Sequence, residues 1–349
     1  MEEYLARVEP LKDEFLEEAQ KRLDSLTKPR GSLGRLEEFV RHYVAVKQEL
    51  RPAINRKTIL ILAGDHGVAE EEVSLYPKEV TSQMVRNFLH KGAAISVLAR
   101  FIGARLYVVD MGVDHDFEPV EGLVIRRVAR GTANITKGPA MTARQALEAV
   151  LAGIEIVEEV KREGVDIIGV GDMGIGNTTP SSAIIAAVAG LPAREVTGRG
   201  TGVDDRGLEK KIEVVERALS VNRPDPRDPL DVLAKLGGFE IAGITGVAIG
   251  ASANRIPVVA DGLISTAGIL IATEMNPRIK AYIFASHSSA EIGHRVMLDR
   301  IGIRPVLDLS MRLGEGTGAA LGIQLVDAAL RLYNEMATFE EAGVSGKKG

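Results

Sequence analysis

Short apolar runs alternate with stretches of helical spacing along most of the chain, and the runs are apolar at nearly every position. A strand with one face in solvent alternates apolar and polar residues, so uninterrupted runs indicate strands that are buried on both faces of a parallel sheet. Six runs fit this pattern: Thr58–Ala63, Leu106–Val109, Val165–Val170, Ile256–Ala260, Ala281–Ala285 and Arg304–Leu309. The sequence therefore predicts an α/β fold, with a six-stranded parallel sheet and helices on either side.

The remaining stretches predict helices, and their order suggests two parts of the chain. Glu14–Ser25 and Leu36–Leu50 precede the first strand, which predicts a separate helical subdomain. A Gly- and Ala-rich segment, Ala242–Ala253, is expected to pack closely against its neighbours. The other predicted helices are Val80–Phe101, Thr142–Arg162, Ser181–Gly190, Gly207 to about Leu219, a pair within Pro229–Arg255, and Gly318–Met336; residues 113–139 are expected to be irregular and residues 343–349 to form a frayed tail.

Composition excludes several classes of function. The 349 residues carry a net charge of −5 and only 4% aromatic residues, whereas a nucleic-acid face needs a basic stripe or stacking aromatics. The absence of cysteine excludes disulfides and thiolate metal sites. No apolar run is long enough for a membrane span, and the acidic N-terminus does not resemble a signal peptide. We therefore expect a cytoplasmic protein that binds neither nucleic acid nor membrane.

The most informative stretch is GVDIIGVGDMGIGNTTPSSAIIAAVAGLP at residues 164–192. Its apolar start predicts a buried strand, glycines then break the strand, and Asn177 and Thr178 are residue types that cap helices. A strand, a Gly-rich turn and a helix N-terminus in this order present free backbone N–H groups to an anion. Gly169, Gly171 and Gly174 also match G-x-G-x-x-G, a pattern that by itself does not specify one ligand.

A second informative stretch, MRLGEGTGAAL at residues 311–321, places Glu315 between glycines just before a long apolar helix. The glycines allow a ligand to approach the carboxylate closely. Two interpretations stay open: a functional carboxylate, or an acid that simply favours the positive end of the helix.

Several polar clusters also have two interpretations. His287, Glu291 and His294 have helical spacing for a metal site, but their spacing is not a known zinc pattern, and a structural or ligand-contacting role is favoured. Asp65 and His66 follow a strand and could contact a ligand or a dimer partner. The acidic segment at residues 114–116 is interpreted as a solvated loop, and no metal site is predicted.

Two further groups could belong to a binding site. Lys211 follows the Gly-rich loop Thr197–Gly202 and is either a solvated helix residue or a point charge for phosphate. Tyr76 and Met84, with nearby apolar and amide side chains, either line an aromatic pocket or belong to the core.

Taken together, these stretches resemble the nicotinate-nucleotide:dimethylbenzimidazole phosphoribosyltransferase family of cobalamin nucleotide-loop assembly. The resemblance extends from about residue 26 to 335. The matching segments are KPRGSLGRL (28–36), GDHGV (64–68), YPKEVT (76–81), VARGTAN (128–134), residues 169–180, VLAKLGGFEIAGITGVAIG (232–250), residues 286–291 and RLGEGTGAA (312–320).

The resemblance implies an activity and an architecture. Phosphoribose would move from nicotinate mononucleotide to 5,6-dimethylbenzimidazole or a related base, giving an α-ribazole phosphate and nicotinate, without a cofactor or metal. The protein would be a homodimer with a Rossmann-like six-stranded sheet and a small helical domain built from both chain ends. The corresponding boundaries are residues 1–55, with part of 318–349, for the small domain and residues 56–317 for the large catalytic domain.

The resemblance also assigns roles to particular residues. Glu315 matches the catalytic base, and Asp172 stands where the family often has a glutamate that is one methylene longer. Three groups complete the implied site: Lys211, Gly174 and Ser289 at phosphate-binding positions, Asn177 and Thr178 in the same turn, and Tyr76, Met84 and Leu313 in the base pocket. Because Tyr76 and Met84 lie in a variable region of the family, the resemblance does not identify the base that the protein prefers.

These residue types suit the implied reaction. Nicotinate leaves from a cationic pyridinium and needs no acid, whereas the incoming imidazole-type base must lose a proton, which Glu315 can accept. Asp172 could stabilise positive charge on the ribosyl carbon or hold the ribose hydroxyls.

Two other classes of function remain as alternatives. The Gly169–Gly174 motif could belong to a dinucleotide-dependent oxidoreductase, which expects an acidic residue about 20 positions later at the end of the next strand. Glu195 is near that distance but precedes a Gly-rich loop. A non-catalytic small-molecule sensor or carrier on the same scaffold is the third interpretation.

Overall fold

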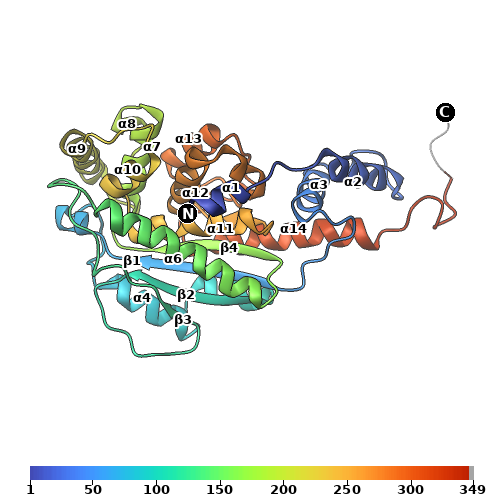
Figure 1. Ribbon diagram of the computed structural model, residues 1–349, viewed down its shortest axis with the longest axis horizontal. Helices are drawn as coiled ribbons and strands as arrows, with labels where there is room; N and C mark the ends of the chain where they lie inside the picture. The colour runs from blue at the N-terminus through green and yellow to red at the C-terminus, as the bar shows by residue number, and fades with distance from the viewer. Residues whose placement is uncertain (346–349) are drawn as a thin grey trace.

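Six parallel strands form the centre of the computed structural model, which describes residues 1–345; part of the predicted tail lies outside these residues. The strand order is β3-β2-β1-β4-β5-β6, and every pair of neighbours is parallel (Figure 1). The strands are β1 (Lys57–Gly64), β2 (Ala104–Gly112), β3 (Leu123–Ile125), β4 (Ile167–Met173), β5 (Val258–Ala260) and β6 (Ile283–Ala285). The predicted α/β class and six-stranded parallel sheet are confirmed.

Helices cover both faces of the sheet. The helices are α1 (Glu2–Arg7), α2 (Asp13–Ser25), α3 (Arg35–Lys47), α4 (Val80–Leu89), α5 (Ala94–Phe101), α6 (Ala143–Arg162), α7 (Thr178–Ala189), α8 (Ala193–Val196), α9 (Asp205–Asn222), α10 (Pro229–Leu236), α11 (Phe239–Ala253), α12 (Leu263–Met275), α13 (Ile292–Ile301) and α14 (Thr317–Glu335), with 3-10 helices at Gly67–Glu71 and Pro277–Tyr282. Alternate residues of β1 point into two cores: Leu60 and Leu62 pack with α6 and α11, and Ile59 and Ile61 pack with α14.

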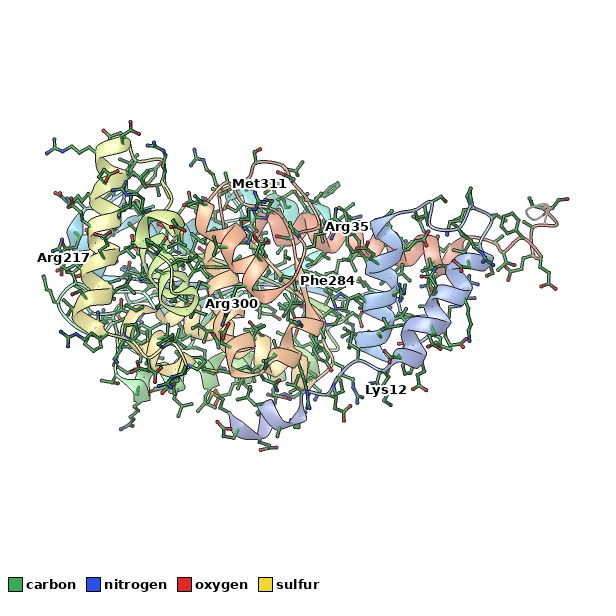
Figure 2. All side chains as sticks on the ribbon, turned by 90° about the horizontal axis from the view of Figure 1, so that it is seen from above. Lys12, Arg35, Arg217, Phe284, Arg300 and Met311 are labelled. Atoms are coloured by element: carbon green, nitrogen blue, oxygen red, sulfur yellow. The ribbon has the colours of Figure 1, made fainter. Side chains whose placement is uncertain are left out.

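The first helices lie at one end of the molecule. Figure 1 shows α2 and α3 beside α14, and Figure 2 shows Arg35 on this side and Arg217, on α9, at the opposite end. The Tyr333 hydroxyl on α14 donates to the Leu50 carbonyl oxygen at 2.9 Å, and Arg22 Nε on α2 donates to the Tyr333 carbonyl oxygen at 3.0 Å. The two ends of the chain thus pack against each other.

One predicted strand was wrong and one was missed. Residues 304–309 form only an isolated bridge between Leu307 and His287, because Pro305 has no N–H to donate. The strand that was missed is β3, which lies within residues 113–139, the span expected to be irregular. It is a three-residue edge strand with Ile125 exposed, too short to produce a recognisable pattern.

The predicted helices differ from the structure at several places, and the sequence analysis predicted no helix at α1, α8 or α13. The stretch predicted as one helix over 80–101 is two helices, α4 and α5, because the chain reverses through Lys91, at φ 63°, and Gly92. Helix α12 was not predicted at all; eleven of its residues are buried, so it has no polar face to produce a helical period. The close packing expected of the Gly- and Ala-rich helix is confirmed: a Cβ on Gly246 of α11 would lie 1.9 Å from the Val150 carbonyl oxygen of α6.

No helix within residues 1–345 is both long enough and apolar enough to cross a membrane.

Candidate active site

A cavity of about 690 Å³ opens at the carboxyl ends of the central strands, where open parallel sheets bind ligands. Nine of the ten residues that the sequence predicts for the site line this cavity, and Lys211 is the exception. The lining residues are Tyr76, Val80, Met84, Asp172, Met173, Gly174, Ile175, Asn177, Thr178, Gly200, Thr201, Gly262, Leu263, Ile264, His287, Ser289, Glu291, Arg312, Leu313, Gly314 and Glu315.

The stretch from β4 to α7 folds as the sequence predicts. Strand β4 ends at Met173, a turn with Gly176 at φ 91° follows, and α7 begins at Thr178. Asn177 occupies the N-cap position, but its side chain does not cap the helix; its Nδ2 donates to Asp172 Oδ2 at 2.9 Å. The Thr179 N–H donates to the Gly176 carbonyl oxygen at 3.0 Å and Pro180 has no N–H, so within residues 1–345 the Thr178 N–H is the donor left free at the start of α7. Asn177 fixes the carboxyl group beside it.

Packing against backbone atoms explains two of the three glycines in the G-x-G-x-x-G pattern. A Cβ on Gly171 would lie 2.2 Å from the Gly316 nitrogen, and a Cβ on Gly174 would lie 2.4 Å from the Gly64 carbonyl oxygen. Glu195 lies on the short helix α8 and not at the end of a strand, so the acidic residue of the dinucleotide pattern is missing from its expected place.

Glu315 lies in a tight left-handed turn before α14. Gly314, Glu315 and Gly316 have φ of 82°, 62° and 82°, a conformation that is unfavourable for glutamate and free of strain for the glycines. The turn packs directly against Gly171 at the end of β4, and the Glu315 side chain lines the cavity while the residue is only 8% exposed. Glu315 and the turn after β4 therefore line the same cavity.

The surroundings of Glu315 change its proton affinity. Within residues 1–345 no hydrogen bond reaches its carboxyl group, and the Asp261 carboxylate lies nearby. Burial, together with the charge of Asp261, raises the pKa of Glu315 to about 7. A carboxyl group with this pKa can accept a proton near neutral pH and release it again.

Asp261 is a functional residue that the sequence analysis missed. It follows β5 and accepts N–H groups from Gly316 at 2.8 Å, Gly318 at 2.7 Å and Ala319 at 3.2 Å. It therefore satisfies the N-terminus of α14 and holds the Glu315 turn in place. The only signal in the sequence was an Asp-Gly pair after a predicted strand.

Asp172 is enclosed more completely than Glu315. It is 5% exposed, and its Oδ1 has no hydrogen-bond partner within the described residues. Burial, with the negative charges of Asp261 and Glu240, raises the pKa of Asp172 well above its usual range. Burial and the neighbouring carboxylates therefore favour the protonated form of Asp172 over the charged one.

Lys211 lies behind the cavity wall. Its Nζ donates to Thr178 Oγ1 at 2.9 Å, and a Cβ on Gly200 would lie 2.6 Å from the same nitrogen. Burial lowers the pKa of Lys211 to about 8. On the cavity side, Arg312 donates to the Gly200 carbonyl oxygen at 3.4 Å and Glu291 accepts the Gly200 N–H at 2.9 Å.

The residues predicted for the base pocket lie at the mouth of the cavity. Tyr76 and Leu313 are 55% and 57% exposed, and Met84, on α4, lines the cavity. An apolar mouth opposite a polar floor suits a ligand with an aromatic part and a charged part.

His66 and His294 are both buried but have different roles. His66 is fully buried with Glu240, Nε2 to Oε1 2.6 Å, and supports the turn at Gly174 without reaching the cavity. His294 Nδ1 accepts the Ser289 N–H at 3.0 Å, and burial lowers the pKa of His294 to about 3. Within residues 1–345, no group of three His, Asp or Glu side chains is placed to hold a metal ion.

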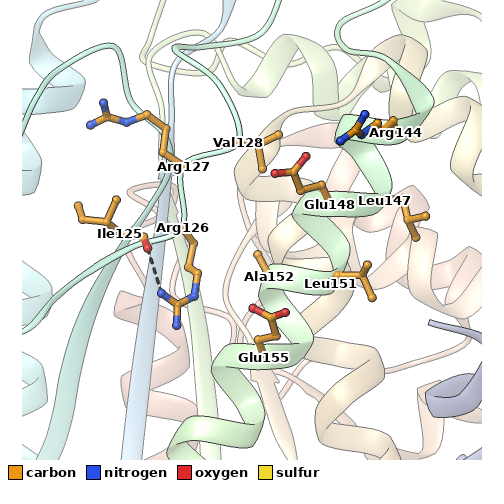
Figure 3. A pocket seen from close by; sticks show the side chains of 10 residues that line it. All are labelled: Ile125, Arg126, Arg127, Val128, Arg144, Leu147, Glu148, Leu151, Ala152 and Glu155. Atoms are coloured by element: carbon orange, nitrogen blue, oxygen red, sulfur yellow. Dashed lines mark hydrogen bonds between the residues drawn. The ribbon is translucent and has the colours of Figure 1, made fainter.

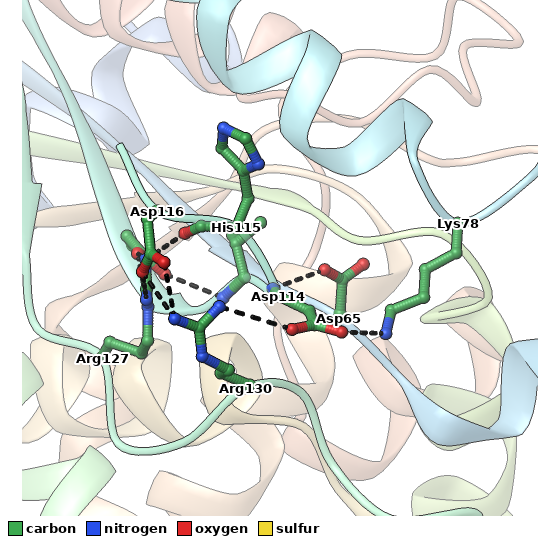
Figure 4. Close-up of polar contacts among 9 residues, drawn as sticks. Asp65, Lys78, Asp114, His115, Asp116, Arg127 and Arg130 are labelled. Atoms are coloured by element: carbon green, nitrogen blue, oxygen red, sulfur yellow. Dashed lines mark hydrogen bonds and ion pairs between the residues drawn. The ribbon is translucent and has the colours of Figure 1, made fainter. Parts of the chain in front are cut away.

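The acidic segment at residues 114–116 is exposed, but its carboxylates are paired and not merely solvated. Asp114 pairs with Lys78 at 2.8 Å, and Asp116 pairs with Arg127 and Arg130 at 2.9 and 2.7 Å (Figure 4). This network joins the loop after β2 to the turn before α4 and to the segment after β3.

A second cavity, of about 590 Å³, lies between the end of β3 and α6 (Figure 3). Leu147, Leu151 and Val128 give it an apolar floor, and its half-buried arginines are already paired, Arg126 with Glu159 and Arg127 with Asp110. No residue predicted for the site lines this cavity.

The fold and the first cavity define an α/β protein with a small-molecule site at the carboxyl edge of its sheet. The phosphoribosyltransferase family model matches residues 8–344. Nicotinate-nucleotide–dimethylbenzimidazole phosphoribosyltransferase from Geobacter sp. (strain M21) is 58% identical over 345 residues, 99% of each chain, and that of Geotalea uraniireducens is 59% identical over 99% of this chain and 98% of the relative. The crystal structure of CobT from Thermus thermophilus superposes with a TM-score of 0.92 at 46% identity, covering 95% of this chain and 99% of that one. The chain therefore belongs to the nicotinate-nucleotide–dimethylbenzimidazole phosphoribosyltransferase family, and the resemblance found in the sequence is confirmed.

Proposed function

We propose that this chain transfers 5-phosphoribose from nicotinate mononucleotide to 5,6-dimethylbenzimidazole or a related base, with Glu315 as the general base. The products are α-ribazole 5′-phosphate and nicotinate. The observation that carries the proposal is the position of Glu315, buried in the wall of the cavity that the turn after β4 also lines, with a pKa raised to about 7 by burial and by Asp261.

The reaction needs one proton acceptor and no acid. One nitrogen of the benzimidazole attacks the anomeric carbon, while the bond to the pyridinium nitrogen breaks and its electron pair stays on nicotinate. The other nitrogen of the benzimidazole then releases its proton to Glu315. A base with a pKa near the working pH combines a large ionised fraction with a useful proton affinity.

The phosphoribosyl end of the donor is assigned to the polar floor of the cavity. Gly174, Asn177 and Thr178 line the cavity at the start of α7, where the Thr178 N–H has no acceptor within residues 1–345, and Ser289 supplies a hydroxyl group from the loop after β6. Lys211 contributes its positive charge from behind Thr178. Tyr76, Met84 and Leu313 are assigned to the aromatic base at the mouth.

Asp172 is assigned to the ribose hydroxyl groups. A protonated carboxyl group cannot stabilise positive charge on the anomeric carbon, but it can donate a hydrogen bond to a hydroxyl group. Its Oδ1, which has no hydrogen-bond partner within residues 1–345, and the raised pKa caused by burial both support this assignment over the electrostatic one. The aspartate, shorter than the family's usual glutamate, is held in position by Asn177.

Product analysis tests the proposed reaction against the oxidoreductase and carrier alternatives. The purified protein is incubated with nicotinate mononucleotide and a panel of benzimidazoles, and the products are identified by mass spectrometry. We expect stoichiometric nicotinate and an α-riboside phosphate. Stoichiometric NAD(H) binding by calorimetry with no transfer product would support an oxidoreductase, and ligand binding without turnover would support a carrier.

The family membership also motivates proposals on assembly and location. We propose a cytoplasmic homodimer with a small helical domain at residues 1–55 and part of 318–349, and a large domain at residues 56–317. Packing of α3 against α14, and of α2 against α3, supports the domain assignment. Sedimentation velocity at micromolar concentration should give the mass of two chains; a single-chain mass would contradict the homodimer.

A further inference from the structure

A second helix N-terminus opens into the active-site cavity. Helix α12 begins at Leu263, and Gly262, Leu263 and Ile264 all line the cavity. The first N–H groups of a helix have no acceptor within it, and here they find none elsewhere within residues 1–345. A helix N-terminus alone does not make a ligand site, so the assignment of a site here depends on the side chains beside it.

His287 places an unpartnered nitrogen beside this helix N-terminus. The residue is 1% exposed, and its Nε2 has no hydrogen-bond partner within the described part of the chain. A Cβ on Gly262 would lie 3.8 Å from His287 Nε2 and 3.9 Å from Ser289 Cβ. The imidazole nitrogen, the Ser289 side chain and the first turn of α12 therefore surround one small space in the cavity.

The hydrogen bond of the other ring nitrogen, Nδ1, is set by its neighbours. Ser286 Oγ donates to the Asp261 carbonyl oxygen at 3.2 Å and lies 3.0 Å from His287 Nδ1, so that Nδ1 is the donor to Ser286. The Asp261 carboxylate, 3.8 Å from Nδ1, compensates a positive charge on the ring. With Nδ1 protonated, a second proton on Nε2 makes the ring a cationic donor.

The other cations near the cavity make their hydrogen bonds away from this space and contribute to it only through their charge. Lys211 donates to Thr178 behind the wall, and Arg312 is exposed and donates to the Gly200 carbonyl oxygen. Ser289 Oγ accepts the Glu291 N–H at 3.3 Å, which leaves its O–H free to donate. The donors that converge on the space beside Gly262 suit a tetrahedral anion.

We propose that His287 is a substrate-contacting residue, whose Nε2 donates to the 5′-phosphate of nicotinate mononucleotide together with Ser289 and the first turn of α12. The assignment rests on the proposed transferase function. Discrimination between nicotinate mononucleotide and its phosphate-free riboside then comes in part from His287.

Steady-state kinetics with both donors test the assignment. We expect His287→Ala to raise the KM for nicotinate mononucleotide by about tenfold or more, the loss typical of one hydrogen bond to a charged group, while kcat/KM for nicotinate riboside and the KM for the base stay within about twofold. His287→Gln should recover part of the loss, because its amide nitrogen can donate from nearly the same place. His115→Gln, on the loop after β2, is the control and should match the wild-type protein.

A second variant keeps the test independent of folding defects in the histidine variants. A methyl group on Gly262 would meet its nearest atom, His287 Cε1, at 3.6 Å, an ordinary contact, so Gly262→Ala should fold normally. The methyl group would occupy the proposed phosphate position, and calorimetry with inorganic phosphate should show binding at least about tenfold weaker.

Different outcomes separate this proposal from the proposed function. Equal losses for the nucleotide and the riboside, or unchanged phosphate binding in both His287→Ala and Gly262→Ala, would overturn the role of His287. If the wild-type protein shows no transfer but binds inorganic phosphate, and both variants lose that binding, the phosphate site stands and the proposed reaction fails.

Discussion

Replacing the buried carboxyl group of Glu315 by an amide should make the fold more stable as the pH rises. The pKa of Glu315 is about 7 in the folded protein because of burial and Asp261, against an ordinary value of 4.5. A raised pKa means that the folded state favours the protonated form, so its contribution to stability is present below pH 4.5 and is lost as the pH rises through 7. Glu315→Gln removes this dependence while it keeps the size of the side chain and the left-handed backbone of residue 315.

The magnitude follows from the two pKa values. Glu315→Gln should raise the free energy of unfolding by about 1 kcal/mol at pH 5 and by about 3 kcal/mol at pH 8, at 1.36 kcal/mol for each pKa unit. For a chain of 349 residues the larger value corresponds to roughly 4 °C in Tm. Urea unfolding followed by circular dichroism at the two pH values measures the difference.

A matched exposed position provides the control. Glu118→Gln lies on the exposed loop after β2 and should change the free energy of unfolding by less than about 0.5 kcal/mol at both pH values. A stability difference for Glu315→Gln that does not grow between pH 5 and pH 8 would refute the raised pKa, and with it the argument that Glu315 is a poised base.

Three further predictions concern the cavity and its support. The kcat/KM for nicotinate mononucleotide should rise with pH up to about 7, as Glu315 loses its proton, and fall above about 8, as Lys211 loses its charge; a flat profile between pH 5.5 and 7 would contradict this. Gly171→Ala should lower turnover by about 100-fold or more and the free energy of unfolding by about 2 kcal/mol, because the new Cβ would displace the Glu315 turn. Gly138→Ala, whose Cβ would meet no atom of the described residues within 4 Å, is the control for Gly171→Ala, and equal kinetics and stability in the two variants would contradict the argument. His66→Leu should destabilise the fold by about 3–5 kcal/mol by urea unfolding, since it leaves Glu240 buried without its partner, and adding Glu240→Leu should recover most of the loss; a neutral single variant would contradict the pairing.

The parts of the fold that the sequence predicted are those with a strong local pattern. The apolar runs that form β1 and β4 are buried on both faces, so they appear as uninterrupted hydrophobic segments. The turn after β4 could be predicted because glycines and capping residues follow one another in a fixed order. Glu315 stood out as a carboxylate enclosed by glycines.

What the sequence did not predict depends on contacts between distant segments. Helix α12 is buried on all sides and has no period, and the edge strand β3 forms only because β2 offers it a partner. Asp261 becomes important because the turn before α14, more than fifty residues later, places its N–H groups against it. The phosphate position of Lys211 came from the resemblance, and its location behind Thr178 depends on how the 197–202 loop folds.

The most direct test of the proposed mechanism is the rate of a single turnover with Glu315→Gln. Enzyme in excess over nicotinate mononucleotide is mixed with 5,6-dimethylbenzimidazole at pH 8, and the release of nicotinate is followed. Loss of the general base should slow transfer by at least about 100-fold while the Kd for nicotinate mononucleotide stays within about threefold. A rate within tenfold of the wild-type protein, at unchanged Kd, would contradict Glu315 as the proton acceptor.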